Sequence, residues 1–172
     1  RAQELGFAEA DPTFDVEGYD AAHKLSILSS MCFSQKIDFD HVNIQGIKAI
    51  ELDDIRAAGD YGYTIRLLAI AKKNKDGHIS QVVRPSLLPK ESDLAGIEWE
   101  KNAVSIRGNY FNELLLSGPG AGRYPTASAI MGDLFDIINN TNYPSLGIPL
   151  KALSKSSKEM NIETSRFYLR LL

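Results

Sequence analysis

An acidic stretch, broken by proline and glycine, runs directly into an apolar segment near the start of the chain. It reads E-A-D-P-T-F-D-V-E-G-Y-D-A-A-H-K over residues 9–24. Asp11-Pro12 requires an extended or turn geometry, and the apolar spacing over residues 17–33 predicts a helix. Side chains four residues apart share one face of a helix, so Asp20 and Lys24 project into the same space. These two charges form the first candidate site.

The pair has two interpretations. A carboxylate and an ammonium at this spacing often form a surface ion pair, which adds only about 0.3–0.5 kcal/mol of stability. The alternative is a largely buried face, because most neighbours on the helix are apolar: Tyr19, Ala21, Ala22, Leu25, Ile27 and Leu28. A buried lysine needs a carboxylate partner or a shifted pKa, and such a lysine can donate and accept a proton.

The loop before this helix holds more carboxylates than a helix cap requires. They are Glu9, Asp11, Asp15 and Glu17. Extra carboxylates near a turn suit a cationic ligand group such as an ammonium.

Alternating and periodic patterns predict the remaining elements of an α+β domain. Strands are expected over residues 42–50, 63–72, 78–88, 102–107 and 110–117. Helices are expected over residues 51–58, ended by Gly59, and 125–139, with proline in the first turn. Turns at 75–77 and 108–109 predict two hairpins, 93–99 a short turn or helix, and 1–5 a last helical turn. We expect a mixed, largely antiparallel sheet with helices packed over it.

Composition agrees with one globular domain and argues against several classes of protein. The 172 residues are 44% hydrophobic and 24% charged, which is enough for a sizeable core. A net charge of −3 without a Lys/Arg-rich run gives no sign of the basic surface that nucleic-acid-binding proteins have. No apolar run approaches the roughly 20 residues needed to cross a bilayer. The single Cys32 excludes an intrachain disulfide, and the three histidines lack metal-ligand spacing.

A glycine cluster, G-P-G-A-G at residues 118–122, follows a predicted strand and precedes a predicted helix. Its spacing does not fit the GxGxxG dinucleotide fingerprint, and Pro119 and Pro125 fit that fingerprint poorly. A tight strand-to-helix connection that needs positive φ is the alternative.

Residues 6–24, G-F-A-E-A-D-P-T-F-D-V-E-G-Y-D-A-A-H-K, resemble the catalytic segment of homoserine dehydrogenase. The resemblance continues, in collinear order over nearly the whole chain, through residues 62–72, 84–90, 102–104 and 118–134. It implies an NAD(P)-dependent oxidoreductase that interconverts L-homoserine and L-aspartate 4-semialdehyde in threonine, methionine and isoleucine biosynthesis. At Phe7 the family often has tyrosine, so a hydroxyl contact is not expected there.

The resemblance also implies roles for individual residues. Lys24 would transfer the proton at the substrate hydroxyl, and Asp20 would orient Lys24 and that hydroxyl. Glu9 would bind the substrate ammonium, with Asp15 as a further substrate contact. Gly118, Gly120 and Ala121 would approach the nicotinamide end of NADP or NAD, and the helix after them would pack on a nucleotide-binding domain N-terminal to Arg1.

In this interpretation residues 1–139 form the catalytic domain, 140–164 a linker region, and 165–172 the truncated first strand of an ACT-type regulatory domain. A homodimer through the sheet and a cytoplasmic location are expected. Because the chain opens on Arg1, we expect the natural N-terminus upstream, and targeting is left open.

Two alternatives stay open. The chain could be a fragment that folds and dimerises but is inactive without its nucleotide-binding half. It could also be a non-catalytic amino-acid-binding module, in which Glu9, Asp15 and Asp20 form an ammonium pocket and Lys24 binds a carboxylate.

Overall fold

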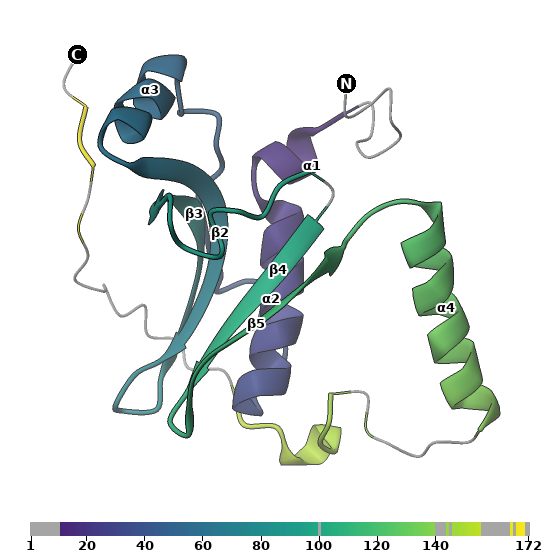
Figure 1. The fold of residues 1–172 in the computed structure, drawn as a ribbon. Coiled ribbons are helices and arrows are strands. Elements are labelled where there is room, and N and C mark those ends of the chain that lie inside the picture. The colour runs from purple at the N-terminus through teal and green to yellow at the C-terminus, as the bar shows by residue number, and fades with distance from the viewer. Residues whose placement is uncertain are drawn as a thin grey trace. The chain divides into compact units, whose positions relative to one another are not determined.

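The computed structural model, drawn as a ribbon in Figure 1, describes residues 11–99, 101–139, 144, 146–155, 166 and 168–170. The chain divides into two compact units. The larger unit comprises Thr13–Leu87 and Tyr143–Leu172, and the smaller unit Arg1–Pro12 and Leu88–Asn142. The helical turn expected at residues 1–5, together with Phe7 and Glu9, lies outside the described residues, as does most of the expected linker.

The larger unit contains a three-stranded sheet, in the order β1-β3-β2, covered by helix α2. Its elements in chain order are α1 (Thr13–Val16), α2 (Tyr19–Phe33), β1 (Asn43–Ile44), α3 (Leu52–Asp60), β2 (Tyr63–Lys73), β3 (Ile79–Pro89) and the 3-10 helix η1 (Leu150–Ala152). Strand β1 runs parallel to β3, whereas β2 and β3 are joined as a hairpin. The expected α+β class with mixed sheets is therefore confirmed.

The core of this unit lies between α2 and the sheet. Ala22 and Leu25 of α2 pack with Val42 and Val83, and partly buried apolar side chains surround them: Ala21, Phe39, Ile44, Leu67 and Ala71. The rest of the buried stripe on α2 is serine, at positions 26, 29 and 30. Small side chains let the helix approach its neighbours closely, and the serine hydroxyls are satisfied by hydrogen bonds.

Those serines also fix the chain that follows α2. Ser30 donates a hydrogen bond to the Gln35 carbonyl, and the Gln35 side-chain amide donates to the Ser29 hydroxyl at 3.0 Å. The Ser154 backbone N–H donates to the Ser34 carbonyl at 3.0 Å, which anchors residues of the expected linker at the end of α2. Residues 34–36 are thereby held from two sides.

The first predicted hairpin is confirmed. The first strand begins where expected and ends one residue later, and the second strand begins and ends one residue later than expected. Gly77 in the turn has a φ of 86°. Pro85 lies within β3, two residues beyond Val83, whose carbonyl accepts a hydrogen bond from the Gln45 N–H. Backbone groups two residues apart point to the same side, and β1 pairs only as far as Val83. Proline has no backbone N–H to donate. At Pro85 no described strand lies on that side of β3, so the missing N–H costs no inter-strand hydrogen bond.

Three predicted boundaries are wrong. The strand expected over residues 42–50 has only two residues, because the Ile47 N–H donates to the Val16 carbonyl at 2.9 Å instead of continuing the ladder. Part of the expected acidic loop is helix α1, and Gly18, with a φ of 84°, separates it from α2. Helix α3 continues through Gly59 to Asp60.

The smaller unit consists of the antiparallel hairpin β4 (Lys101–Gly108) and β5 (Phe111–Pro119), followed by helix α4 (Arg123–Ile138). The turn falls at residues 109–110, one residue later than predicted, because Gly108 pairs with Phe111 after a shift in register. Residues 93–96 form a turn, within the range where a short turn or helix is expected. Helix α4 has Pro125 in its first turn and buries none of its residues. None of the helices within the described ranges is long and apolar enough to cross a membrane.

Candidate active site

Helix α2 holds Asp20 and Lys24 one turn apart, with the lysine Nζ 2.6 Å from the aspartate Oδ2. The spacing in the sequence predicts this contact. Of the two interpretations, the structure agrees with the surface ion pair and not with the buried face, because the Lys24 and Asp20 side chains are 56% and 41% exposed. The reason is that α2 turns its alanine and serine stripe to the sheet, and the ion pair lies on the opposite side of the helix.

The exposed face of α2 continues as an apolar strip. Ile27 and Met31, which follow Lys24 along the same side, are 44% and 49% exposed. Leu28 and Tyr19 are also exposed. The ion pair is thus bordered by apolar side chains that this chain leaves in water.

Gly18 forms the junction between α1, which carries Asp15, and α2, which carries the ion pair. The Gly18 N–H donates to the Asp15 carbonyl at 3.0 Å, and Gly18 itself is buried. A Cβ at Gly18 would lie 3.0 Å from Val83 Cγ1, so both its φ and its packing require glycine. Asp15 is exposed on α1, the short helix that precedes the one carrying Asp20.

The loop at residues 46–48, where the sequence predicts a strand, contacts this junction. A Cβ at Gly46 would lie 2.6 Å from the Val16 carbonyl oxygen and 2.7 Å from Glu17 Cα. Lys48 forms an ion pair with Glu17. The signal that could have revealed this contact is a glycine inside an alternating pattern, which often marks a close backbone approach.

His23, next to Lys24, is held between aromatic rings. Its ring centroid lies 4.1 Å from that of Phe39 and 5.7 Å from that of Phe14, both in stacked orientation. No pattern in the sequence marks this histidine as functional. The stack ties α1 and residue 39 to the helix that carries the ion pair.

The glycine cluster lies in the smaller unit, and its members have different reasons to be glycine. A Cβ at Gly120 would lie 1.8 Å from Asn102 Nδ2, so the asparagine amide occupies the place of a side chain. Gly122 has a φ of 103° and begins α4, as a tight connection requires. Around Gly118 the described residues leave open space within 4 Å, and its φ is not positive. Ala121 is half-buried.

Within the described ranges, no three His, Cys, Asp or Glu side chains gather as a metal site would require. The charged groups that the described residues place near one another here are the Lys24 ammonium and the Asp20 carboxylate.

The sequence model of the homoserine dehydrogenase family matches residues 1–135. The chain belongs to the homoserine dehydrogenase family. A homoserine dehydrogenase of Helicobacter pylori is 40% identical over 99% of the chain, and an NAD(+)-dependent homoserine dehydrogenase of Pseudomonas canavaninivorans is 42% identical over 80%. These matches cover 40% and 39% of the two relatives, so the chain spans about 40% of the length of the curated relatives.

Solved homoserine dehydrogenases share the fold. A crystal structure from Thiobacillus denitrificans matches with a TM-score of 0.82 and 39% identity, covering 91% of this chain and 37% of that one. A hyperthermophilic archaeal homoserine dehydrogenase in complex with NADPH matches with a TM-score of 0.63 and 29% identity, covering 84% and 40% of the two chains. The family resemblance seen in the acidic segment is thus confirmed over most of the chain.

Proposed function

We propose that this chain is the substrate-binding and proton-transfer part of a homoserine dehydrogenase, which interconverts L-homoserine and L-aspartate 4-semialdehyde. The observation that carries the proposal is the contact between Lys24 and Asp20 on an exposed, apolar-edged face of α2. A further part of the whole protein can cover such an apolar-edged face, and this chain spans only about 40% of the length of its curated relatives. We therefore expect the nucleotide-binding half to complete the site and exclude water from it.

The proposed chemistry assigns one role to each charge. When bound, the nicotinamide supplies hydride to the aldehyde carbon or accepts it from the alcohol. Lys24 donates the proton to the substrate oxygen during reduction and takes it back during oxidation. Asp20 balances the lysine charge and holds its Nζ in one position, since the two groups are 2.6 Å apart.

The acidic segment is proposed to recognise the amino-acid part of the substrate. Glu9, which lies outside the described residues, would bind the substrate ammonium. Asp15 on α1 would be a second contact, and the Gly46 and Lys48 contacts with residues 16–17 would hold this segment in place. A charge-assisted hydrogen bond to the ammonium would let the site distinguish an amino alcohol from an alcohol without an amino group.

We propose that the nicotinamide end of NADP or NAD approaches Gly118. Neither positive φ nor packing among the described residues explains the absence of a side chain there, and a ligand that needs the space would. Ala121 is a neighbouring candidate, whereas Gly120 already has a structural reason in Asn102. Residues 1–139 as catalytic domain, 140–164 as linker region and 165–172 as the start of an ACT-type domain, a homodimer through the sheet and a cytoplasmic location remain part of this proposal.

Steady-state kinetics of the complete enzyme test the proposal. Lys24→Ala should lower kcat by about 100-fold or more, which is the usual loss when a general acid-base group is removed. Lys75→Ala, an exposed lysine in the β2–β3 turn, is the matched control and should be unaffected. A normal rate in Lys24→Ala would remove the proton-transfer role.

Calorimetry distinguishes the enzyme from a binding module. The 172-residue chain alone should bind homoserine poorly, because half of its site is missing, and should show no dehydrogenase activity. Tight homoserine binding by the isolated chain, lost in Lys24→Ala, would instead favour the amino-acid-binding module.

A further inference from the structure

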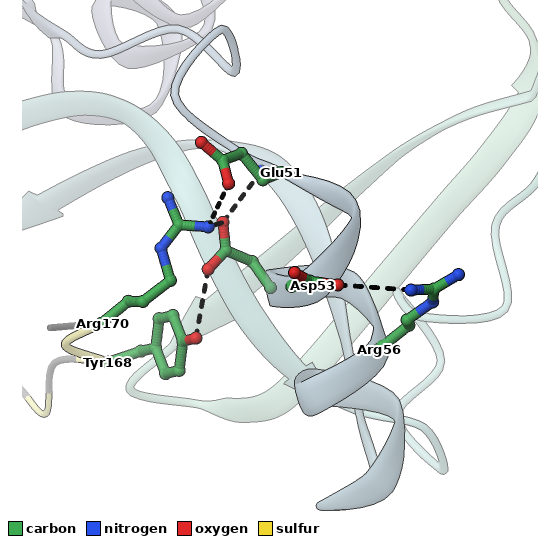
Figure 2. Close-up of polar contacts among 6 residues, drawn as sticks. Glu51, Asp53, Arg56, Tyr168 and Arg170 are labelled. Atoms are coloured by element: carbon green, nitrogen blue, oxygen red, sulfur yellow. Dashed lines mark hydrogen bonds and ion pairs between the residues drawn. The ribbon is translucent and has the colours of Figure 1, made fainter. Parts of the chain in front are cut away.

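The end of the described chain returns to the first turn of α3. Arg170 Nη1 lies 2.7 Å from Glu51 Oε2 and 3.3 Å from Asp54 Oδ2, and the Tyr168 hydroxyl donates a hydrogen bond to Asp54 Oδ1 at 3.1 Å (Figure 2). These contacts join residues more than a hundred positions apart in the sequence. We call the group of Glu51, Asp54, Tyr168 and Arg170 the α3 clasp.

Asp54 is the centre of the α3 clasp. Its side chain is 5% exposed, and both of its oxygens are used. The Glu51 N–H donates to Oδ2 at 2.8 Å as part of a capping box, in which the Glu51 side chain accepts from the Asp54 N–H. The backbone hydrogen bond from Glu51 lowers the pKa of Asp54, burial opposes this, and Tyr168 and Arg170 lower it further. The carboxylate thus belongs both to the helix cap and to the docked segment.

Charge explains why a guanidinium occupies this place. Three acids, Glu51, Asp53 and Asp54, crowd the start of α3. Asp53 pairs with Arg56 on the same helix at 3.3 Å, whereas Arg170 lies beside the other two acids. One terminal nitrogen of the guanidinium, Arg170 Nη1, makes both contacts, so a single positive group lies beside two carboxylates. Burial and then the hydrogen bond to Asp54 raise the pKa of Tyr168, so the hydroxyl keeps its proton.

We propose that the start of α3 is a docking surface for the Tyr168-x-Arg170 segment of this same chain, and that the first turn of α3 and this segment are ordered together. Without Arg170, a buried carboxylate would lose a charged partner, and the cap that shares it would weaken. Helix α3 leads into β2, whose Leu67 packs on the core beneath α2. Contiguous packing therefore links the docked segment to the helix of the candidate active site. This proposal does not depend on the proposed reaction.

Hydrogen exchange in the complete protein, read by mass spectrometry, tests the coupling. In Arg170→Ala, amides of α3 should exchange about tenfold faster, together with those around residue 168, because a charge-assisted hydrogen bond is lost. Arg166→Ala, which removes an exposed arginine of the same segment, is the matched control and should leave α3 unchanged. Tyr168→Phe should produce a smaller acceleration in the same peptides.

Two results would overturn the proposal. One is unchanged exchange in α3 while the segment around residue 168 becomes fast in Arg170→Ala, since the segment would then only rest on the helix. The other is an equal effect of Arg166→Ala. If Arg170→Ala fails to fold, Arg170→Lys keeps the positive charge but does not place its ammonium where the guanidinium Nη1 lies, and it should accelerate α3 exchange to an intermediate extent. Wild-type exchange of α3 in Arg170→Lys and in Tyr168→Phe would count equally against the coupling.

Discussion

Replacing Gly46 by alanine should loosen the junction that leads into the candidate active site. The added Cβ would lie 2.6 Å from the Val16 carbonyl oxygen and 2.7 Å from Glu17 Cα, well inside ordinary contact distances. Both atoms belong to the backbone, so a side-chain rotation cannot relieve the clash. The same Val16 oxygen accepts the hydrogen bond from the Ile47 N–H at 2.9 Å, which must lengthen as the loop moves away.

The magnitude follows from these two contacts. Overpacking by one methyl group costs about 1–3 kcal/mol, and a weakened backbone hydrogen bond adds about 1 kcal/mol. We expect Gly46→Ala to lower the free energy of unfolding by about 2–3 kcal/mol, within the range given by those two effects. Because the displaced residues 16–17 lie directly before α2, the KM for homoserine of the complete enzyme should also rise.

Urea denaturation of the chain, followed by circular dichroism, measures the first effect. Gly96→Ala is the matched control, because its Cβ would lie at an ordinary 3.6 Å from the Asp93 carbonyl oxygen. If Gly46→Ala changes the free energy of unfolding by less than about 0.5 kcal/mol, as an ordinary surface substitution does, the loop does not pack closely on the junction.

Three further predictions follow from burial, charge and space. Leu25→Ala should lower the free energy of unfolding by about 2–5 kcal/mol, and Ile27→Ala, on the exposed side of α2, by less than about 0.5 kcal/mol in the same urea titration. Asp54 has a lowered folded-state pKa, so the unfolded chain binds more protons below about pH 4, and stability should fall there as the pH decreases. In acid titrations, Asp54→Asn should lose less stability than the unsubstituted protein as the pH decreases. Gly118→Ala should weaken cofactor binding in fluorescence titrations of the complete enzyme, with the thermal midpoint unchanged.

Each of these has a clear contradicting result. Equal effects of the Leu25 and Ile27 substitutions would mean that the exposed face of α2 is packed within the chain. An acid transition in Asp54→Asn that matches the unsubstituted protein would remove the carboxylate from the pH dependence. Normal cofactor affinity in Gly118→Ala would leave that glycine without a ligand to explain it.

Local patterns in the sequence determined much of this fold. Helical spacing alone placed Lys24 beside Asp20, because residues one turn apart meet regardless of the rest of the structure. Turn residues predicted both hairpins, since a few neighbouring positions decide the direction of the chain. Periodicity also predicted α3 and α4 to within a few residues.

The tertiary structure decided which surfaces are buried and which distant residues meet. The most apolar side of α2 is not its buried side, because close packing on the sheet selects alanine and serine over Ile27 and Met31. A glycine inside an alternating pattern signals a close backbone approach at Gly46, but only the folded structure shows that residues 16–17 are the backbone that approaches. The contact of Arg170 with Glu51 spans 119 positions, and only the path of the folded chain brings these charges together. Periodicity describes neighbours along the chain, whereas burial and long-range pairing depend on what the rest of the molecule places against them.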